Sequence, residues 1–167
     1  DVHHADAAHQ QADGRDGAGA ELEGIHAVVH GFDEEGNPAM DEISTIGKTK
    51  MAILYNDKIE VKEVYPEDFG IKRPDRELIK ASSSLYENKE IVLGVLKGNE
   101  ESEMDIARLD LCLVNAGAIL FIAGAAKDFK HGFKIARKAV KSGKTLEKLN
   151  EFIKSSNDSN IVKMSTD

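Results

Sequence analysis

The chain has 167 residues, of which 41% are hydrophobic, and this length and composition favour one globular domain over a disordered polypeptide. A formal net charge of −8 and an isoelectric point near 5.3 disfavour general nucleic-acid binding, which requires a basic face that neutralises phosphates. A single cysteine, Cys112, excludes an internal disulfide framework and a cysteine-rich zinc site, and it fits a reducing, cytoplasmic setting.

Residues 1–24 differ in composition from the rest of the chain. They contain no lysine, and only Val2 and Leu22 are sizeable apolar side chains. Such a segment can bury little apolar surface, so we predict that it is atypical and poorly ordered. It has neither the basic start nor the apolar centre of a secretory signal. A cluster within it could chelate a transition metal, although incidental binding is the better interpretation; the cluster is His3, His4, Asp6 and His9.

The apolar run Ile25–Val29 predicts a buried strand, and the glycine-rich residues after it predict a loop over 32–42. Ligands of α/β sheets gather at the carboxyl ends of strands. Asp41 and Glu42 lie in this loop and offer the hard oxygen ligands that hold Mg²⁺ in sites shared with substrate phosphates. Taken alone, an Asp-Glu pair is more often a solvated loop.

The next elements are a hairpin and then helices. Residues 50–55 and 58–64 alternate apolar and polar side chains around Asn56-Asp57, which is a β-hairpin signal. Residues 66–74 are expected to form an irregular connection. Helical spacing then predicts helices over 75–81, 87–96, 102–123, 129–142 and 145–154. Ser102 is the expected cap of the third helix, and Gly98 and Gly143 are expected to end the second and the fourth. A polar tail follows over 157–167.

The longest apolar stretch, Leu111–Ala126, predicts a buried core helix. Its 16 residues fall short of the ~20 that cross a bilayer, so we expect no membrane association. Asn115 is the one polar residue inside it. Because burying an amide costs free energy unless it is hydrogen-bonded, we predict that Asn115 ties this helix to a neighbouring loop rather than contacting a substrate.

Several short motifs occur in one order and at compatible spacing. They are His30-Gly31, Asp41-Glu42-Ile43-Ser44, Gly47, Thr49, Pro66-Glu67-Asp68-Phe69-Gly70, Leu113-Val114-Asn115-Ala116, Ala123-Gly124 and Ser142-Gly143-Lys144. On these motifs the chain resembles the carboxyl-terminal half of anthranilate phosphoribosyltransferase, of the glycosyl transferase family 3 type. The resemblance implies that residues 25–156 form the carboxyl-terminal part of a mixed-sheet α/β domain of the nucleoside phosphorylase/phosphoribosyltransferase type. It further implies a β-hairpin and a helical carboxyl-terminal half.

The resemblance also implies an activity. The family transfers the 5-phosphoribosyl group from phosphoribosyl pyrophosphate to anthranilate, giving N-(5-phosphoribosyl)anthranilate and pyrophosphate in tryptophan biosynthesis. Pyrophosphate leaves readily only when its charge is neutralised, so such a pentosyltransferase needs Mg²⁺. Asp41 and Glu42 match the metal-binding pair of the family and are our predicted Mg²⁺ ligands; no residue is assigned as catalytic or substrate-binding.

The family's main phosphoribosyl pyrophosphate-binding motifs are Gly-Thr-Gly-Gly-Asp and Lys-His-Gly-Asn-Arg, and neither occurs in the 167 residues. Both lie amino-terminal to the matched region in the family, as does a helical domain that carries its dimer contact. We therefore expect the chain to behave as a fragment that is nearly inactive in isolation, and we expect a homodimer only for a full-length family protein.

Other candidate residues have structural interpretations. His30 could orient a ligand or a carboxylate, but a histidine at a strand end is more often structural. Ser44 and Thr49 could touch phosphate oxygens, but such hydroxyls commonly bond their own backbone. A basic strip is expected to be a solvated helix face; it comprises Lys130, Lys134, Arg137, Lys138 and Lys141.

Two other functions stay open on the sequence. One is a noncatalytic binding module on the same fold, which would use the basic strip. The other is a related nucleoside phosphorylase. The Asp-Glu-Ile-Ser and Pro-Glu-Asp-Phe-Gly motifs together favour the transferase.

Overall fold

The computed structural model describes residues 24–157. The predictions for the amino-terminal segment 1–24 and the polar tail 157–167 therefore fall outside the described residues, except at Gly24 and Asn157, as do those for the histidine cluster. Within the described range no helix is long and apolar enough to span a membrane.

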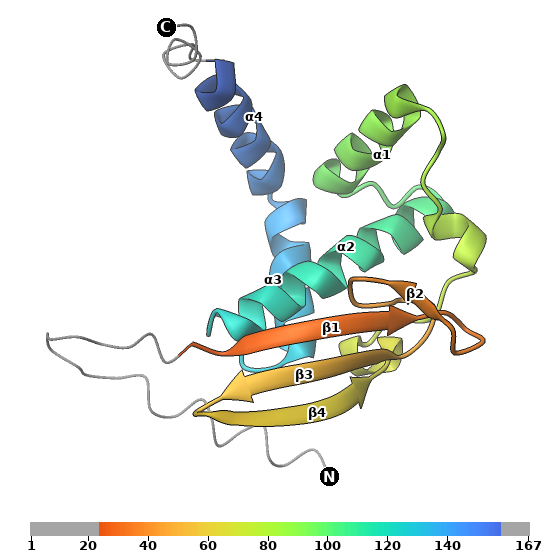
Figure 1. Ribbon diagram of the computed structural model, residues 1–167. Helices are drawn as coiled ribbons and strands as arrows, with labels where there is room; N and C mark the ends of the chain where they lie inside the picture. Colours follow the sequence, from red (N-terminus) through yellow and green to blue (C-terminus); the bar gives the residue numbers. More distant parts are fainter. Residues whose placement is uncertain (1–23, 158–167) are drawn as a thin grey trace, which may run out of the picture.

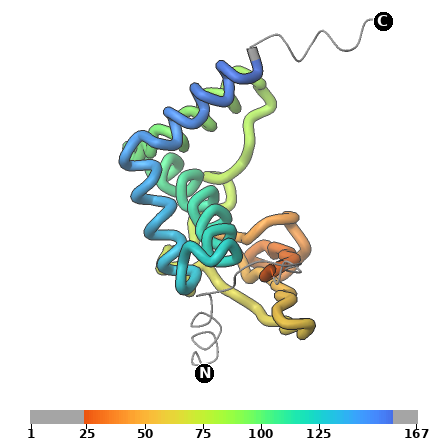
Figure 2. The backbone as a smooth tube through the Cα atoms, turned by 90° about the vertical axis from the view of Figure 1, so that its left-hand side faces the viewer, coloured from red at the N-terminus to blue at the C-terminus, as the bar shows by residue number. Residues whose placement is uncertain are grey.

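Four antiparallel strands form one sheet in the order β2-β1-β3-β4. The strands are β1 (His26–Phe32), β2 (Pro38–Met40), β3 (Thr49–Tyr55) and β4 (Lys58–Val64). The helices gather on one side of the sheet (Figures 1 and 2). The expected α/β class, with a β-hairpin and a helical carboxyl-terminal half, is confirmed.

The β3–β4 hairpin follows from its turn residues. Tyr55 pairs with Lys58, so only Asn56 and Asp57 connect the strands. Both have positive φ angles, 48° and 58°. Asparagine and aspartate tolerate this left-handed backbone, which matches the twist of the two strands, and the predicted turn is confirmed.

Two expectations for the amino-terminal part of the sheet were wrong. The strand predicted as buried is β1, which alternates: Ala27 and Val29 pack on the core, whereas Val28 is 74% exposed. The cause is that the helices among residues 24–157 cover only one face of the sheet. The predicted loop over 32–42 contains β2, which pairs with the end of β1 through Gly31 and Met40.

The helices confirm the predicted pattern. They are η3 (Pro66–Phe69), η4 (Arg76–Ile79), α1 (Leu85–Lys97), α2 (Glu103–Ile122), α3 (Phe129–Lys141) and α4 (Lys144–Asn157). Ser102 caps α2 by accepting a hydrogen bond from the backbone of Asp105, and Gly98 ends α1 in the left-handed conformation. The short helix η3 lies where an irregular connection was expected.

The core lies between the inner face of the sheet and helices α2 and α3. Its members include Met51, Val64, Phe69, Leu113, Val114 and Phe133. The two helices touch at Gly117 and Gly132, where a Cβ on Gly117 would lie 2.5 Å from the backbone nitrogen of Phe133. Two glycines at this crossing therefore permit backbone-to-backbone packing.

The apolar helix predicted as a buried core helix is buried on one side only. Leu113 and Val114 in α2 are covered, but Cys112 and Ile119 on the same helix are exposed. The prediction was wrong for these residues because the sheet and α3 cover one side of α2, whereas η4 and α1 contact the helix without burying the rest of it.

Candidate functional site

The candidate metal ligands Asp41 and Glu42 follow β2 directly. Both side chains are exposed, at a bend between the end of β2 and a buried segment that runs from Ile43 to Gly47. Because β2 is paired to the end of β1, the sheet fixes where this bend begins. The structure thus presents both carboxylates to solvent from an anchored segment.

Asp33 organises the turn that leads to the acidic pair. Its Oδ1 accepts hydrogen bonds from the backbone N–H of Asn37 at 2.7 Å and of Glu35 at 3.0 Å, and its Oδ2 accepts one from the Asn37 side chain. These bonds hold the pKa of Asp33 below its ordinary value. The sequence analysis missed this residue, although an aspartate three residues before a Gly-Asn pair is typical of such a turn.

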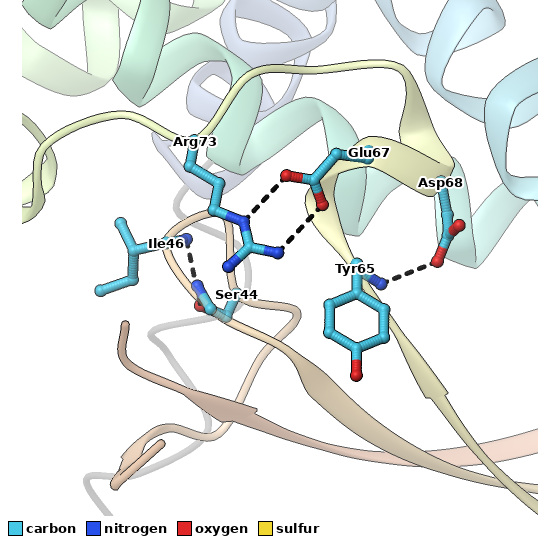
Figure 3. A network of polar contacts seen from close by, with 7 residues as sticks. Ser44, Ile46, Tyr65, Glu67, Asp68 and Arg73 are labelled. Carbon is cyan, nitrogen blue, oxygen red and sulfur yellow. Dashed lines mark hydrogen bonds and ion pairs between the residues drawn. The ribbon is translucent and has the colours of Figure 1, made fainter. Parts of the chain in front are cut away.

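Ser44 and Thr49 hold the segment after the pair. Ser44 Oγ donates to the Phe32 carbonyl at 2.7 Å and accepts from the backbone of Ile46 at 3.2 Å (Figure 3) and of Gly47 at 3.0 Å. Thr49 Oγ1 accepts from the Ser44 backbone N–H at 2.8 Å. Both residues are buried. As expected, these hydroxyls bond the chain's own backbone.

Asn115 ties α2 to the same segment. Its Oδ1 accepts from the Ile43 backbone N–H at 2.9 Å, and its Nδ2 donates to the Ile43 carbonyl at 3.2 Å and to the Leu111 carbonyl at 2.9 Å. All three bonds stay inside the protein. The predicted structural role of Asn115 is confirmed, and the loop that it fixes begins at the residue after Glu42.

Thr45 lies in this segment with its side chain fully buried. Its Oγ1 has no hydrogen-bond partner among the described residues. An unsatisfied buried hydroxyl costs stability, so this position is a weak point in an otherwise well-bonded segment.

The electrostatics of the acidic pair favour a cation. Partial burial, and then the neighbouring Asp41 charge, raise the pKa of Glu42. A divalent ion would relieve this repulsion. In residues 24–157 no third histidine, cysteine, aspartate or glutamate joins the pair in a metal-binding cluster. Two carboxylates still suit Mg²⁺, which usually keeps several waters and takes further oxygens from substrate phosphates.

Cys112 of α2 lies within the electrostatic influence of the Glu42 carboxylate. Part of its side chain reaches solvent, but shielding by the surrounding groups, and then the Glu42 carboxylate, raise the pKa of its thiol. A raised pKa keeps the thiol protonated, so the residue is not an activated nucleophile.

The structure does not place His30 in the acidic pair. Its imidazole is exposed and packs edge-on against the Phe32 ring at a centroid distance of 5.0 Å. Within the described part of the chain it makes no hydrogen bond or ion pair with Asp41 or Glu42.

The basic strip on α3 is interrupted. Arg137 pairs with Glu100, in the connection between α1 and α2, and at 3.3 Å with Asp110 of α2; Lys141 also pairs with Glu100. The guanidinium of Arg137 lowers the pKa of Glu100, whereas burial raises the pKa of Asp110. The opposite face is buried as expected. Three exposed lysines of the strip have no acidic partner among residues 24–157: Lys130, Lys134 and Lys138.

The Pro66–Gly70 motif is a structural turn. Figure 3 shows Arg73 donating twice to the Glu67 carboxylate, at 2.9 and 3.1 Å, and the Tyr65 backbone N–H donating to Asp68 at 2.8 Å. Phe69 is 1% exposed and stacks on Phe129 of α3. The motif therefore anchors the connection between the sheet and the helices.

Comparison with known proteins agrees with this geometry. Residues 12–146 match the model of the glycosyl transferase family, a/b domain. The chain is 44% identical over 126 residues to the anthranilate phosphoribosyltransferase of Methanothermobacter thermautotrophicus, which covers 75% of this chain and 36% of that protein. It is 43% identical over 131 residues to the enzyme of that name from Methanosphaera stadtmanae, covering 78% and 38%. The chain thus spans little more than a third of these relatives' length.

Solved structures give the same result. A variant of anthranilate phosphoribosyltransferase from Saccharomyces cerevisiae with Mg bound matches with a TM-score of 0.63 and 26% identity, covering 77% of this chain and 35% of that one. The yeast enzyme in complex with PRPP and Mg matches with a TM-score of 0.60 and 26% identity, covering 77% and 34%.

Proposed function

Because the chain belongs to the glycosyl transferase family, a/b domain, we propose that it supplies the carboxyl-terminal part of an anthranilate phosphoribosyltransferase. In this proposal, the complete domain transfers the 5-phosphoribosyl group from phosphoribosyl pyrophosphate to anthranilate. The observation that carries the proposal is the exposed pair Asp41 and Glu42, which precedes a buried segment fixed by Asn115 and Ser44.

In this function Asp41 and Glu42 hold Mg²⁺. The bound ion would neutralise charge on the departing pyrophosphate. Asn115 and Ser44 keep the following backbone in one conformation, so the carboxylates need little reorganisation when the ion and substrate arrive. The yeast structures described with Mg, and with PRPP and Mg, support this choice of ion and substrate.

The described residues of this chain hold only part of such a site. The phosphoribosyl pyrophosphate-binding motifs of the family are not in the sequence, and catalysis of a two-substrate reaction depends on holding both substrates in one geometry. We therefore expect that the chain alone has little activity and that the complementary part of a relative restores it.

A chimera tests this function. In the chimera, the matched 126 residues of the Methanothermobacter thermautotrophicus relative are replaced by the corresponding residues of this chain. We expect it to form N-(5-phosphoribosyl)anthranilate in the presence of Mg²⁺, at a rate at least a hundredfold above that of the chain alone. A folded chimera that instead cleaved a nucleoside with phosphate would support the nucleoside phosphorylase alternative and refute the proposal.

A further inference from the structure

The inner face of β1 ends at a residue that has no side chain. Ala27 and Val29 pack on the core, and Gly31 is the next residue on the same face of the strand. Gly31 is buried, and its φ angle is not positive. Because this backbone conformation suits any residue, a requirement for glycine at this position can only be a requirement for space.

The space beside Gly31 is filled by the backbone of the acidic pair. A Cβ on Gly31 would lie 2.5 Å from the Glu42 carbonyl oxygen and 2.6 Å from Cγ of Met40. The Met40 side chain is half-buried and can rotate away, but the carbonyl belongs to the main chain. The Glu42 carbonyl thus lies where a third inward side chain of β1 would otherwise lie.

The same peptide unit is held at its other end by α2. The Glu42 carbonyl and the Ile43 N–H belong to one planar peptide. Asn115 Oδ1 accepts a hydrogen bond from this N–H at 2.9 Å. The Glu42–Ile43 peptide is therefore held between two elements, with Gly31 of β1 against its carbonyl and Asn115 of α2 on its N–H.

The position of this peptide affects the direction of the Glu42 side chain. With a methyl group at position 31, the carbonyl oxygen would have to move by about half an ångström to reach 3.0 Å, a separation below which side chains are hardly ever found. Because Asn115 holds the N–H end, the peptide can yield only by rotating or by changing that hydrogen bond. A site residue has to be held within about 0.5 Å of its productive geometry, and Mg²⁺ demands a nearly ideal octahedron.

We propose that Gly31 is a positioning residue, which directs the Glu42 carboxylate toward the ion by letting the Glu42–Ile43 peptide lie directly against β1. The inference rests on the proposed function for the identity of the ion, whereas the position of the peptide is a property of the fold. A methyl group at position 31 displaces the peptide, turns the carboxylate and weakens Mg²⁺ binding.

Hydrogen exchange in the chain itself tests the position of the peptide. In Gly31→Ala, the Ile43 amide should exchange roughly tenfold faster relative to the amides of β3, because its bond to Asn115 opens locally. A variant that only lost overall stability would speed both classes of amide alike. Such a parallel change in Gly31→Ala would overturn the proposal.

Gly98→Ala is the matched control. Gly98 has a φ angle of 73°, and a Cβ there would lie 2.8 Å from Cγ1 of Val140, so the substitution destabilises the chain at the end of α1. It should speed the exchange of the Ile43 amide only in parallel with the amides of β3.

Mg²⁺ binding gives a second readout. Isothermal titration calorimetry of the chimera, without either substrate, should show a Kd for Mg²⁺ roughly fivefold higher in Gly31→Ala than in the parent chimera. The Kd should be unchanged in Gly98→Ala. An unchanged Kd in Gly31→Ala would overturn the proposal.

Met40→Ala separates the two contacts of a side chain at position 31. Combined with Gly31→Ala, it removes the contact with Met40 Cγ and keeps the contact with the Glu42 carbonyl, so the double variant should fold even if Gly31→Ala alone folds poorly. It should regain stability and still bind Mg²⁺ weakly. Full recovery of Mg²⁺ binding would show that Gly31 acts through Met40 and would overturn the proposal.

Failure of the proposed function gives a different pattern. A parent chimera that bound no Mg²⁺ would refute Asp41 and Glu42 as ligands of the ion. In that case the exchange of the Ile43 amide would still decide whether Gly31 fixes the position of Glu42.

Discussion

The side-chain amide of Asn115 hydrogen-bonds both backbone groups of Ile43, a residue 72 positions earlier in the chain. A backbone pair that would otherwise be buried without partners is satisfied by one side chain. Because Ile43 follows Glu42, this contact is the most direct structural link between the core helix α2 and the candidate metal ligands.

Removing the Asn115 amide should destabilise the protein. Asn115→Ala leaves the N–H and C=O of Ile43 unsatisfied, so we expect the free energy of unfolding to fall by about 2–3 kcal/mol in urea denaturation. Asn115→Asp keeps an acceptor for the Ile43 N–H but sets a carboxylate oxygen against the Ile43 and Leu111 carbonyls, so at neutral pH it should lose at least as much stability. An Asn115→Asp variant as stable as the parent would show that the amide does not donate to these carbonyls.

Substitution by valine should change the free energy of unfolding in opposite directions at Thr45 and Thr49. Thr45→Val removes a buried hydroxyl without a partner among the described residues, so we expect a gain of about 1 kcal/mol in the free energy of unfolding. Thr49→Val removes the acceptor of the Ser44 N–H and should cost about 1–2 kcal/mol. Shifts of the same sign in both variants would contradict this account of the segment.

The contact between α2 and α3 should not tolerate a methyl group. A Cβ at position 117 would meet the Phe133 backbone at 2.5 Å, so Gly117→Ala should lower the free energy of unfolding by about 1–3 kcal/mol. Gly94→Ala in α1 is the control, because its Cβ would meet the nearest side-chain atom at 3.5 Å. The control should stabilise by up to about 1 kcal/mol, as alanine does in a helix interior.

Glu42 should make the stability depend on pH. Its pKa is raised in the folded chain, so its contribution is favourable at acid pH and is lost as the pH rises through the raised value. Glu42→Gln removes this dependence and should have a slightly higher Tm than the parent at pH 7.5, with the difference vanishing near pH 4. Thermal unfolding at the two pH values measures it.

Asp33 should give a pH dependence of stability opposite in direction to that of Glu42. Its pKa is lowered, so its contribution is present at neutral pH and is lost as the pH falls through the lowered value. Asp33→Asn should therefore lower the Tm at pH 7.5 and differ less from the parent at pH 3. If Glu42→Gln and Asp33→Asn changed the Tm in the same direction at pH 7.5, the assigned pKa directions would be wrong.

Features set by nearby residues could be predicted from the sequence. Asn56-Asp57 specifies the β3–β4 turn locally, and Ser102 specifies the start of α2 through a bond three residues away. The structural role of Asn115 was also predictable, because an amide within an apolar helix needs a partner. Its actual partner, Ile43, is remote in sequence and became visible only in the fold.

Features that depend on distant packing could not be predicted. The exposure of Val28 follows because the helices in the described part of the chain all lie on the other face of the sheet, and that of Ile119 depends on which side of α2 meets α3. The strand β2 is short and depends on pairing with β1. For the candidate site, the anchored segment after Glu42 is a finding, whereas Mg²⁺ binding by Asp41 and Glu42 remains a prediction.

The most direct test of the central claim is the Mg²⁺ dependence of phosphoribosyl transfer in the chimera carrying Asp41→Asn or Glu42→Gln. The account predicts at least a tenfold loss of kcat/KM in each variant, with a higher Mg²⁺ concentration needed for half-maximal rate. Glu34→Gln is the matched control, since Glu34 is exposed on the hairpin before β2, and it should match the parent chimera. Full activity at unchanged Mg²⁺ concentration in the Asp41 and Glu42 variants would contradict the claim that this pair holds the ion.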